Sequence, residues 1–224
     1  MAIFLTEDGS HSIYSEQFGV AYHSTHGAIQ ETKHVFIEAG LNHFIAQREF
    51  KQIKILEIGF GTGLNVFMTF LESHFRGIQI DFTTTEIYPL SISTAAELNY
   101  PQLLNVPHLG SIFNTFHTCN WDEKHRLSDN FLFEKRLVDF QNMDFSDEFD
   151  IVYYDAFSPE SQPELWDIEM LKRTYNALKE GGILTTYCAK GSFKRALKTV
   201  GFQIENIAGP PGKREMTRAS KILK

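Results

Sequence analysis

A glycine-rich turn between a buried strand and a helix is the feature that most constrains the fold of this chain. Residues 53–58 (IKILEI) have the apolar, β-branched composition of a strand, and residues 64–74 (LNVFMTFLESH) have the pattern of a helix. Residues 57–63 between them read EIGFGTG, with glycine at every second position from residue 59. Such glycines let the backbone turn tightly and approach a ligand closely. The G-x-G-x-G spacing differs from the G-x-G-x-x-G of dinucleotide oxidoreductases, and no Lys-Ser/Thr pair follows it as in a P-loop.

Strands and helices alternate along the rest of the chain. Further strands are predicted at residues 78–85, 131–138, 149–154, 183–187, 203–207 and 217–223, and helices at residues 91–98, 168–178 and 192–200. The helix at 168–178 is expected to stop at Gly181-Gly182. This alternation predicts an α/β fold with a mostly parallel, doubly wound sheet.

The first fifty residues have a different pattern. The stretch TEDGSHSIYS at residues 6–15 predicts a hairpin, and residues 32–44 predict a helix that precedes the main sheet. No repeat, low-complexity tract or linker interrupts the sequence. We therefore expect a small N-terminal extension of residues 1–50, packed on a Rossmann-like domain of residues 51–224 in a single structural domain overall.

Composition narrows the class of protein. The chain has 224 residues, of which 42% are hydrophobic and 22% charged, as is typical of a soluble globular domain. Its first residues, MAIFLTEDGS, lack the basic start and the apolar run of a signal peptide, and no window resembles a membrane span. Two cysteines, Cys119 and Cys188, are too few for a disulfide framework. A cytoplasmic protein without membrane contact is therefore expected.

The charges are distributed unevenly. The net charge of −7 by itself argues against a nucleic-acid partner. Residues 190–224, however, carry nine Lys and Arg side chains and two Glu, a net of +7, whereas the preceding 189 residues have a net charge of −14. This distribution predicts one basic surface that binds phosphate, although a solvated C-terminal helix and strand would explain it equally well.

The glycine turn resembles the loop with which class I methyltransferases hold S-adenosyl-L-methionine, because a strand that ends in Glu precedes it. The resemblance implies that Glu57 favours the ammonium group of the cofactor. Glu86, 23 positions after Gly63, ends the second strand, where an acid can accept hydrogen bonds from both ribose hydroxyls. Asp139 ends the next strand and either contacts the adenine amino group or is an ordinary strand end; a purely structural glycine turn is also an alternative. The predicted cofactor-binding residues are Glu57, Gly59, Phe60, Gly61, Thr62, Gly63, Glu86, Asp139 and Asp155.

A second stretch, YYDAFSPESQPELW at residues 153–166, places one carboxylate directly after an apolar strand. Because the carboxyl ends of parallel strands meet at one edge of a sheet, Asp155 is expected to face the same crevice as the glycine turn. An amine that attacks a sulfonium methyl must arrive uncharged, and a carboxylate can orient its N–H group and accept the proton. Phe157 and the prolines would exclude water. Asp155 is thus the predicted catalytic residue, with a cofactor-binding carboxylate or a helix cap as the alternative.

Several motifs occur in an order that is typical of the MnmD family. They are YSEQF at residues 14–18, ETKHVFIEAGL at 31–41, EIGFGTGLN at 57–65, YDAFSPESQPELW at 154–166 and GPPGKREM at 209–216. The chain resembles this family, whose methyltransferase also forms the amino-terminal half of the bifunctional MnmC enzyme. The resemblance implies methyl transfer from S-adenosyl-L-methionine to the amine of 5-aminomethyl-2-thiouridine at the tRNA wobble position, with the anticodon stem-loop as partner. It also implies a substrate site formed by Phe157, Pro159, Trp166, Lys213, Arg214 and Glu215.

Two features depart from the bifunctional pattern. The sequence ends soon after K-R-E-M, so no fused flavin-dependent oxidoreductase domain is expected, and Gly209-Pro210-Pro211-Gly212 stands where G-F-G is more usual. Tyr14, Glu31 and Trp166 either shape the base pocket or only pack the extension and the segment after the fourth strand. The expected phosphate contacts are Lys194, Arg195, Lys198, Lys213, Arg214 and Arg218.

Other interpretations stay open at this stage. A methyltransferase or aminopropyltransferase for a small polyamine-like amine would suit the acidic body of the chain, and a non-catalytic Rossmann-like module could retain the glycine turn. The K-R-E-M cluster favours RNA over a small cation, and Asp155 in its D-x-F-x-P setting argues against a module without activity. The spacing of the potential ligands in one predicted loop fits no common zinc template, so no metal is expected; they are His108, His117, Cys119 and His125.

Overall fold

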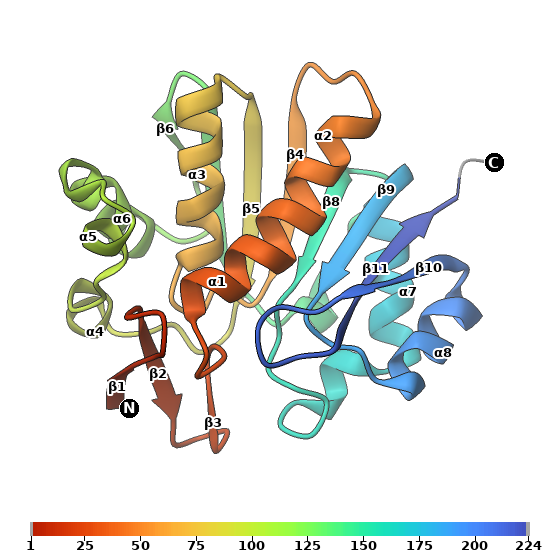
Figure 1. The fold of residues 1–224 in the computed structure, drawn as a ribbon. Coiled ribbons are helices and arrows are strands. Elements are labelled where there is room, and N and C mark those ends of the chain that lie inside the picture. Colours follow the sequence, from red (N-terminus) through yellow and green to blue (C-terminus); the bar gives the residue numbers. More distant parts are fainter. Residues whose placement is uncertain (1, 223–224) are drawn as a thin grey trace.

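An eight-stranded sheet forms the centre of the protein in the computed structural model, which describes residues 2–222 (Figure 1). The strand order is β10-β11-β9-β8-β4-β5-β7-β6. The pairs β4–β5, β4–β8, β5–β7 and β8–β9 are parallel, whereas β6, β10 and β11 pair antiparallel with their neighbours. The strands are β4 (Ile53–Ile58), β5 (Ile80–Glu86), β6 (Lys124–Ser128), β7 (Phe131–Leu137), β8 (Phe149–Tyr154), β9 (Leu178–Thr186), β10 (Phe202–Ala208) and β11 (Glu215–Lys221).

The point where the strand order reverses lies between β4 and β8. From β4 the chain continues to β5 on one side, and it returns to β8 on the other. In doubly wound sheets a ligand crevice forms outside the carboxyl ends of the strands at such a point. The glycine turn follows β4, and Asp155 follows β8, so the topology brings both predicted motifs to this edge. The predicted fold class is therefore observed.

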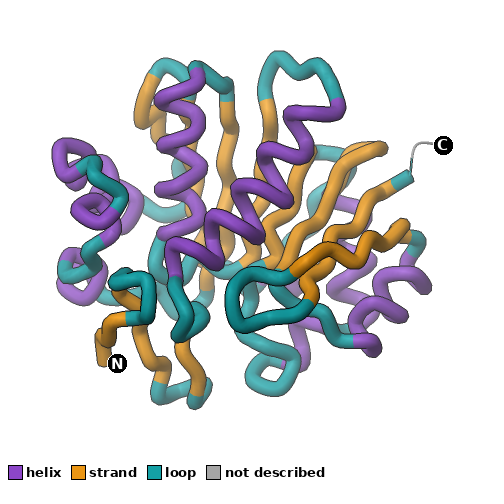
Figure 2. Tube along the Cα trace, in the orientation of Figure 1, coloured by secondary structure: helices purple, strands orange, loops and turns teal. Residues whose placement is uncertain are grey.

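Helices cover both faces of the sheet (Figure 2). On one face lie α3 (Leu64–Arg76) and a continuous helical segment composed of α1 (Ala28–Thr32), η1 (Lys33–Asn42) and α2 (His43–Gln47), packed in the larger apolar core. On the other face lie α7 (Ile168–Ala177) and α8 (Gly191–Val200), which pack with β8, β9 and β11 in the second core. Burial on both faces explains why β4 and β8 are nearly continuous apolar runs in the sequence.

The predicted helix at residues 32–44 is observed, but its middle is wound as a π-helix. Side chains from the sheet bind carbonyl groups of this segment: Thr185 Oγ1 donates to Val35 O at 2.7 Å, and Arg218 Nη1 donates to Ala39 O at 3.1 Å. Gly40 lets the helix approach the sheet, since a Cβ there would lie 3.0 Å from the Thr185 side chain. Insertion of polar groups into a helical ladder is a known cause of such wide turns.

The N-terminal extension forms a small antiparallel sheet of β1 (Ala2–Leu5), β2 (His11–Ser15) and β3 (Val20–Ala21), so the predicted hairpin is confirmed. The extension is fixed to the segment after β5, because His11 N donates to Asn99 Oδ1 at 2.9 Å and Tyr100 Oη donates to His11 O at 2.8 Å. That segment contains α4 (Ile92–Ala96), α5 (Tyr100–Leu103), η2 (Pro107–Leu109) and α6 (Gly110–Thr118). The extension therefore lies beside the carboxyl edge of the main sheet.

Three predictions about local structure were wrong. Gly181-Gly182 does not terminate a helix: α7 ends at Ala177, and the glycine pair lies inside β9, where the register with β8 shifts. The expected loop that carries the histidines is instead helix α6 followed by strand β6. The last strand begins at Glu215 rather than residue 217, and its predicted end at Leu223 lies outside the described residues, as does Lys224 of the basic segment.

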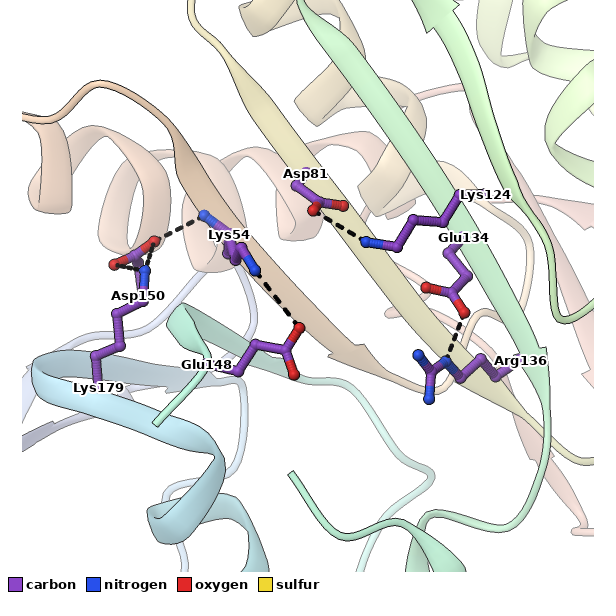
Figure 3. A network of polar contacts seen from close by, with 8 residues as sticks. All are labelled: Lys54, Asp81, Lys124, Glu134, Arg136, Glu148, Asp150 and Lys179. Atoms are coloured by element: carbon purple, nitrogen blue, oxygen red, sulfur yellow. Dashed lines mark hydrogen bonds and ion pairs between the residues drawn. The ribbon is translucent and has the colours of Figure 1, made fainter. Parts of the chain in front are cut away.

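Figure 3 shows a group of ion pairs on the main sheet. Lys54, Asp81 and Asp150 lie near the amino ends of β4, β5 and β8, whereas Glu134 and Arg136 lie farther along β7. Asp150 accepts hydrogen bonds from the backbone N–H of Lys54 and from Lys179 Nζ, both at 2.8 Å. The remaining pairs are Lys54–Glu148, Lys124–Asp81 and Arg136–Glu134. The connection from β7 to β8 contains only the short helix η3 (Phe140–Asn142), so polar side chains rather than a crossover helix cover this part of the sheet.

Candidate active site

A cavity of about 240 Å3 lies at the carboxyl ends of β4, β5 and β8. Its wall comes from the turns after these strands and from the N-terminal extension, which contributes residues 20–24. Of the predicted site residues, it contains Gly59, Phe60, Gly61, Thr62, Glu86, Asp139, Asp155, Phe157 and Lys213. The glycine turn and the predicted catalytic carboxylate thus share one opening.

Gly59 holds the turn close to the strand that carries Asp155. Its φ is +94°, a value that L-residues rarely adopt, and a Cβ at this position would lie 2.8 Å from the carbonyl oxygen of Asp155. Gly61 has a φ of +50°, and its N–H donates to Glu86 Oε2 at 3.0 Å. Any larger residue at position 59 would push the two motifs apart.

The two acids at the ends of β5 and β7 are held by backbone N–H groups. Glu86 Oε1 accepts from the N–H groups of Ile87 and Tyr88, each at 2.8 Å. Asp139 caps η3, since its Oδ1 accepts from Gln141 N at 2.9 Å. Asp139 also lines the cavity, so the strand-end role and a cofactor contact are compatible for this residue.

Asp155 is oriented by a relay of side chains from α3 and the N-terminal helix. Asn65 Nδ2 donates to Asp155 Oδ2 at 2.8 Å, and Asn65 Oδ1 in turn accepts from Thr32 Oγ1 at 2.9 Å. Burial raises the pKa of the Asp155 carboxyl well above its usual range, and the Glu31 carboxylate raises it further. The Asn65 hydrogen bond and the Lys213 ammonium oppose this change.

Lys213 supplies a positive charge beside Asp155. Its Nζ lies 2.7 Å from Glu31 Oε1 and 4.0 Å from the centre of the Tyr187 ring. Glu31 is buried and also accepts from Ser24 N through Oε2 at 2.9 Å, and Tyr187 Oη donates to Ala156 O at 2.8 Å. The cation is therefore fixed by a carboxylate on one side and by an aromatic face on the other.

An aromatic cluster closes one side of the cavity. The Phe157 ring packs against Phe18 and Tyr22 of the extension, with ring centres 4.7 Å and 4.8 Å apart, and Phe18 also contacts Tyr88. Trp166 does not line the cavity, although it was predicted in the substrate site. It is buried, and its Nε1 donates to Phe157 O at 2.7 Å, so its observed role is to position the loop that carries Phe157.

Two predicted cofactor residues also lie outside the cavity lining. Gly63 begins α3 with a φ of +73°, and a Cβ there would meet His117 Nε2 at 2.9 Å. Glu57 is fully buried, and neither of its carboxylate oxygens has a hydrogen-bond partner among residues 2–222. Burial raises the pKa of Glu57 well above its usual range; the neighbouring Asp155 adds to this effect, whereas the polar side chains of Thr84 and Asn65 oppose it.

The other predicted substrate residues line a second, adjacent cavity. Pro159, Arg214 and Glu215 lie there, and its volume is about 570 Å3. It shares Ser158, Tyr187 and Lys213 with the first cavity. The K-R-E-M segment therefore borders both cavities rather than one.

The residues of the first cavity fit S-adenosyl-L-methionine. Gly59 and Gly61 leave space that a Cβ would fill, and Glu86 offers a fixed carboxylate at the cavity wall. Within the described part of the chain, no group of three His, Cys, Asp or Glu side chains is arranged to hold a metal ion.

Comparison with known proteins agrees with this geometry. Residues 123–222 match a protein family described as S-adenosyl-L-methionine-dependent methyltransferase. The chain is 29% identical to the tRNA 5-methylaminomethyl-2-thiouridine biosynthesis bifunctional protein MnmC of Marinomonas sp. (strain MWYL1), over 94% of this chain and 32% of the relative. It is 30% identical to MnmC of Leptospira interrogans serovar copenhageni, over 90% of this chain and 32% of the relative. The chain resembles the methyltransferase half of MnmC.

Solved structures give the same result. MnmC2 from Aquifex aeolicus superposes with a TM-score of 0.75 and 25% identity, over 97% of this chain and 69% of that chain. A spermidine synthase from Thermotoga maritima, with a TM-score of 0.52 and 14% identity, shares the fold alone. The predicted class I methyltransferase fold is confirmed by the match to MnmC2, and the family match agrees with an S-adenosyl-L-methionine-dependent methyltransferase. The chain spans about one third of the length of the MnmC relatives.

Several cavity residues were not predicted from the sequence. Tyr22 and His23 come from the extension, and His23 Nε2 lies 2.7 Å from Thr62 Oγ1. Burial lowers the pKa of His23 to about 4, so its ring is neutral at pH 7. Asn65 could have been suspected, because it is the polar residue that follows the glycine turn on a helix face expected to be buried. Of the two extension residues considered for the base pocket, Glu31 lines the cavity and Tyr14 does not, and nothing in the sequence pattern singles out Tyr22 and His23.

Proposed function

We propose that this chain is an S-adenosyl-L-methionine-dependent N-methyltransferase that converts 5-aminomethyl-2-thiouridine to 5-methylaminomethyl-2-thiouridine at the tRNA wobble position. The observation that carries the proposal is the shared cavity of the glycine turn and Asp155, where a Cβ on Gly59 would lie 2.8 Å from the Asp155 carbonyl oxygen. The MnmC relatives are named for the biosynthesis of the methylated nucleoside, which supports this choice of substrate.

Asp155 would orient the substrate amine and accept its proton. The bound cofactor supplies an electrophilic methyl group on a sulfonium, so the amine must present a free lone pair. Asn65 holds one oxygen of Asp155, which leaves the other available to an N–H group of the substrate. The raised pKa of Asp155 makes it a better proton acceptor than an exposed aspartate.

Lys213 and the aromatic cluster would prepare the amine for attack. A fixed ammonium group in the cavity disfavours a second cation, so Lys213 shifts a bound amine toward its neutral form. Phe157, packed between Phe18 and Tyr22, restricts the access of water from the side of the extension. Residues 1–50 are thus proposed to be part of the catalytic domain rather than a separate unit.

The proposed partner is the anticodon stem-loop of tRNA, in the cytoplasm. A wobble base can be splayed from the loop into a cavity, and lysine and arginine side chains then meet the phosphates. Arg195 and Lys198 on α8 and Arg214 after β10 are exposed and make no ion pair within residues 2–222. None of the helices in the described region has the length and apolar character of a membrane span.

The test is a turnover assay with undermodified tRNA and labelled S-adenosyl-L-methionine, followed by mass spectrometry of the nucleosides. The expected product is 5-methylaminomethyl-2-thiouridine. Asp155→Asn should lower the rate by roughly 100- to 10,000-fold, the typical contribution of a general base, while cofactor affinity is retained. Efficient methylation of a free diamine with no methylation of tRNA would instead favour a small-amine substrate.

A further inference from the structure

The second cavity is bordered by none of the residues of the glycine turn and does not include Asp155. It lies beyond the wall formed by Ser158, Tyr187 and Lys213, on the side away from the glycine turn. Its remaining lining comes from the loop after β8, the turn before α8 and the K-R-E-M segment: Pro159, Cys188, Ala189, Lys190, Arg214 and Glu215. A ligand that enters the first cavity with a covalently attached neighbour would place that neighbour here.

The wall between the two cavities is fixed. Lys213 is held by Glu31 Oε1 at 2.7 Å and lies over the Tyr187 ring, whose hydroxyl is bonded to Ala156 O. Thr217 Oγ1 donates to Cys188 O at 2.6 Å, which fixes the floor of the second cavity from β11. The separation between the two cavities is therefore set by the fold.

The charged side chains around the second cavity differ in whether they are already engaged in an ion pair. Lys190 is paired with Glu160, and Glu215 accepts from Lys194 Nζ at 3.0 Å. Arg214 is exposed and forms no ion pair in the region that the structure describes, although its charge acts on the neighbouring Glu215. An apolar floor beside an exposed guanidinium matches a planar base joined to a phosphate.

We propose that the second cavity is a subsite for the nucleobase adjacent to the target nucleotide, with Arg214 bound to the phosphate that links the two. The inference rests on the proposed function, because it assumes an RNA whose target base enters the first cavity. Pro159 and the Tyr187 wall would contact the adjacent base, and this contact would hold the target in register with Asp155.

The experiment uses three anticodon stem-loops that carry the target nucleoside: one intact, one abasic at the 5′ neighbour and one abasic at the 3′ neighbour. Equilibrium binding and kcat/KM are measured for each with the full chain. One abasic RNA should lose about tenfold in both quantities, as expected when a single stacked base is removed. Equal values for all three RNAs would overturn the proposal.

Variants separate the subsite from general phosphate binding. Pro159→Ala and Arg214→Ala should each weaken binding of the intact RNA. Pro159→Ala should not weaken binding further for the abasic RNA that has already lost the contacting base. Lys198→Ala, on the exposed face of α8, is the matched control and should weaken the binding of intact and abasic RNAs by the same factor. If Pro159→Ala and base removal had additive effects on the binding free energy, the proposed subsite would be wrong.

The same measurements distinguish the two proposals. If the intact RNA binds but is not methylated, the proposed function is wrong, and the binding comparison still decides the subsite. If methylation proceeds without any effect of the abasic positions, only the subsite is wrong. If no RNA binds, both proposals fail.

Discussion

At the scale of single residues, the cavity is lined by one ammonium group, that of Lys213, and by four carboxyl groups, those of Glu31, Glu86, Asp139 and Asp155. Asp155 and Glu57 both have raised pKa values because they are buried; Glu31 raises the pKa of Asp155 further, and Asp155 raises the pKa of Glu57 further. The Lys213 ammonium group lowers the pKa of Asp155. Such an arrangement makes the proton affinity of Asp155 depend on which charges are present around it.

The first prediction concerns the pH dependence that Lys213 controls. Replacement by methionine removes a charge that favours ionised Asp155, so the pKa of Asp155 should rise further. Since the carboxylate form must accept the proton, the acidic limb of the kcat/KM profile should move to higher pH, with a loss of about tenfold at pH 7. Lys213→Arg keeps the charge and should leave the limb near its original position. If Lys213→Met lowered kcat/KM by the same factor at every pH and did not move the acidic limb, this role of Lys213 would be wrong.

The second prediction concerns the stability cost of Glu57. A carboxyl whose folded pKa is raised stabilises the fold fully below its unfolded pKa of 4.5 and loses that contribution as the pH rises through the folded pKa. Between these values the wild type should lose about 1.4 kcal/mol of unfolding free energy per pH unit relative to Glu57→Gln. Denaturant unfolding from pH 4 to pH 8 measures the difference. Parallel stability curves for the two proteins would show that Glu57 does not titrate as its burial requires.

At the scale of elements, the glycine turn is the tightest constraint between sequence and site. The third prediction is that Gly59→Ala weakens cofactor binding at least tenfold, because its φ of +94° is strained for alanine and its Cβ would meet the Asp155 carbonyl. Gly77→Ala is the control: Gly77 also has a positive φ, +68°, but a Cβ there has nothing within 4 Å. Gly77→Ala should lose on the order of 1 kcal/mol of stability through its backbone strain alone, and Gly59→Ala should lose more because of the added clash. Only Gly59→Ala should lose cofactor affinity in titration calorimetry.

The sequence predicts the parts of the site that are local and misses those that join distant segments. The turn at residues 57–63, Glu86 and Asp155 follow strands with a clear pattern, and parallel topology brings strand ends together, so their meeting could be anticipated. The contact of Lys213 with Glu31 joins residues 182 positions apart, and no periodicity encodes it. The prediction that Gly181-Gly182 ends a helix was wrong for a related reason. A pair of glycines can end a helix or permit a register shift in a strand, and the pairing of the strand with its neighbours decides between the two.

At the scale of the whole molecule, the basic C-terminal segment is only partly available to RNA. Arg218, which was predicted as a phosphate contact, is buried and bonded to Glu205 and to the Ala39 carbonyl, so that prediction was wrong. Lys194 and Lys213 are engaged with Glu215 and Glu31. Counting charges along the sequence could not separate these structural cations from the exposed ones, because both kinds lie in the same stretch.

The last prediction uses this distinction between exposed and buried cations. Arg195 and Lys198 are exposed on α8, whereas Lys51 is exposed just before β4, at the opposite edge of the sheet from the cavity. Each α8 cation that meets a phosphate releases counterions on binding, so Arg195→Ala should reduce the slope of log K against log salt by about one and weaken binding at low salt. Lys51→Ala should leave the slope and the affinity unchanged. Because neither residue touches the cavity, cofactor affinity should stay constant in both variants, and an Arg195→Ala slope equal to that of Lys51→Ala would place the RNA on another surface.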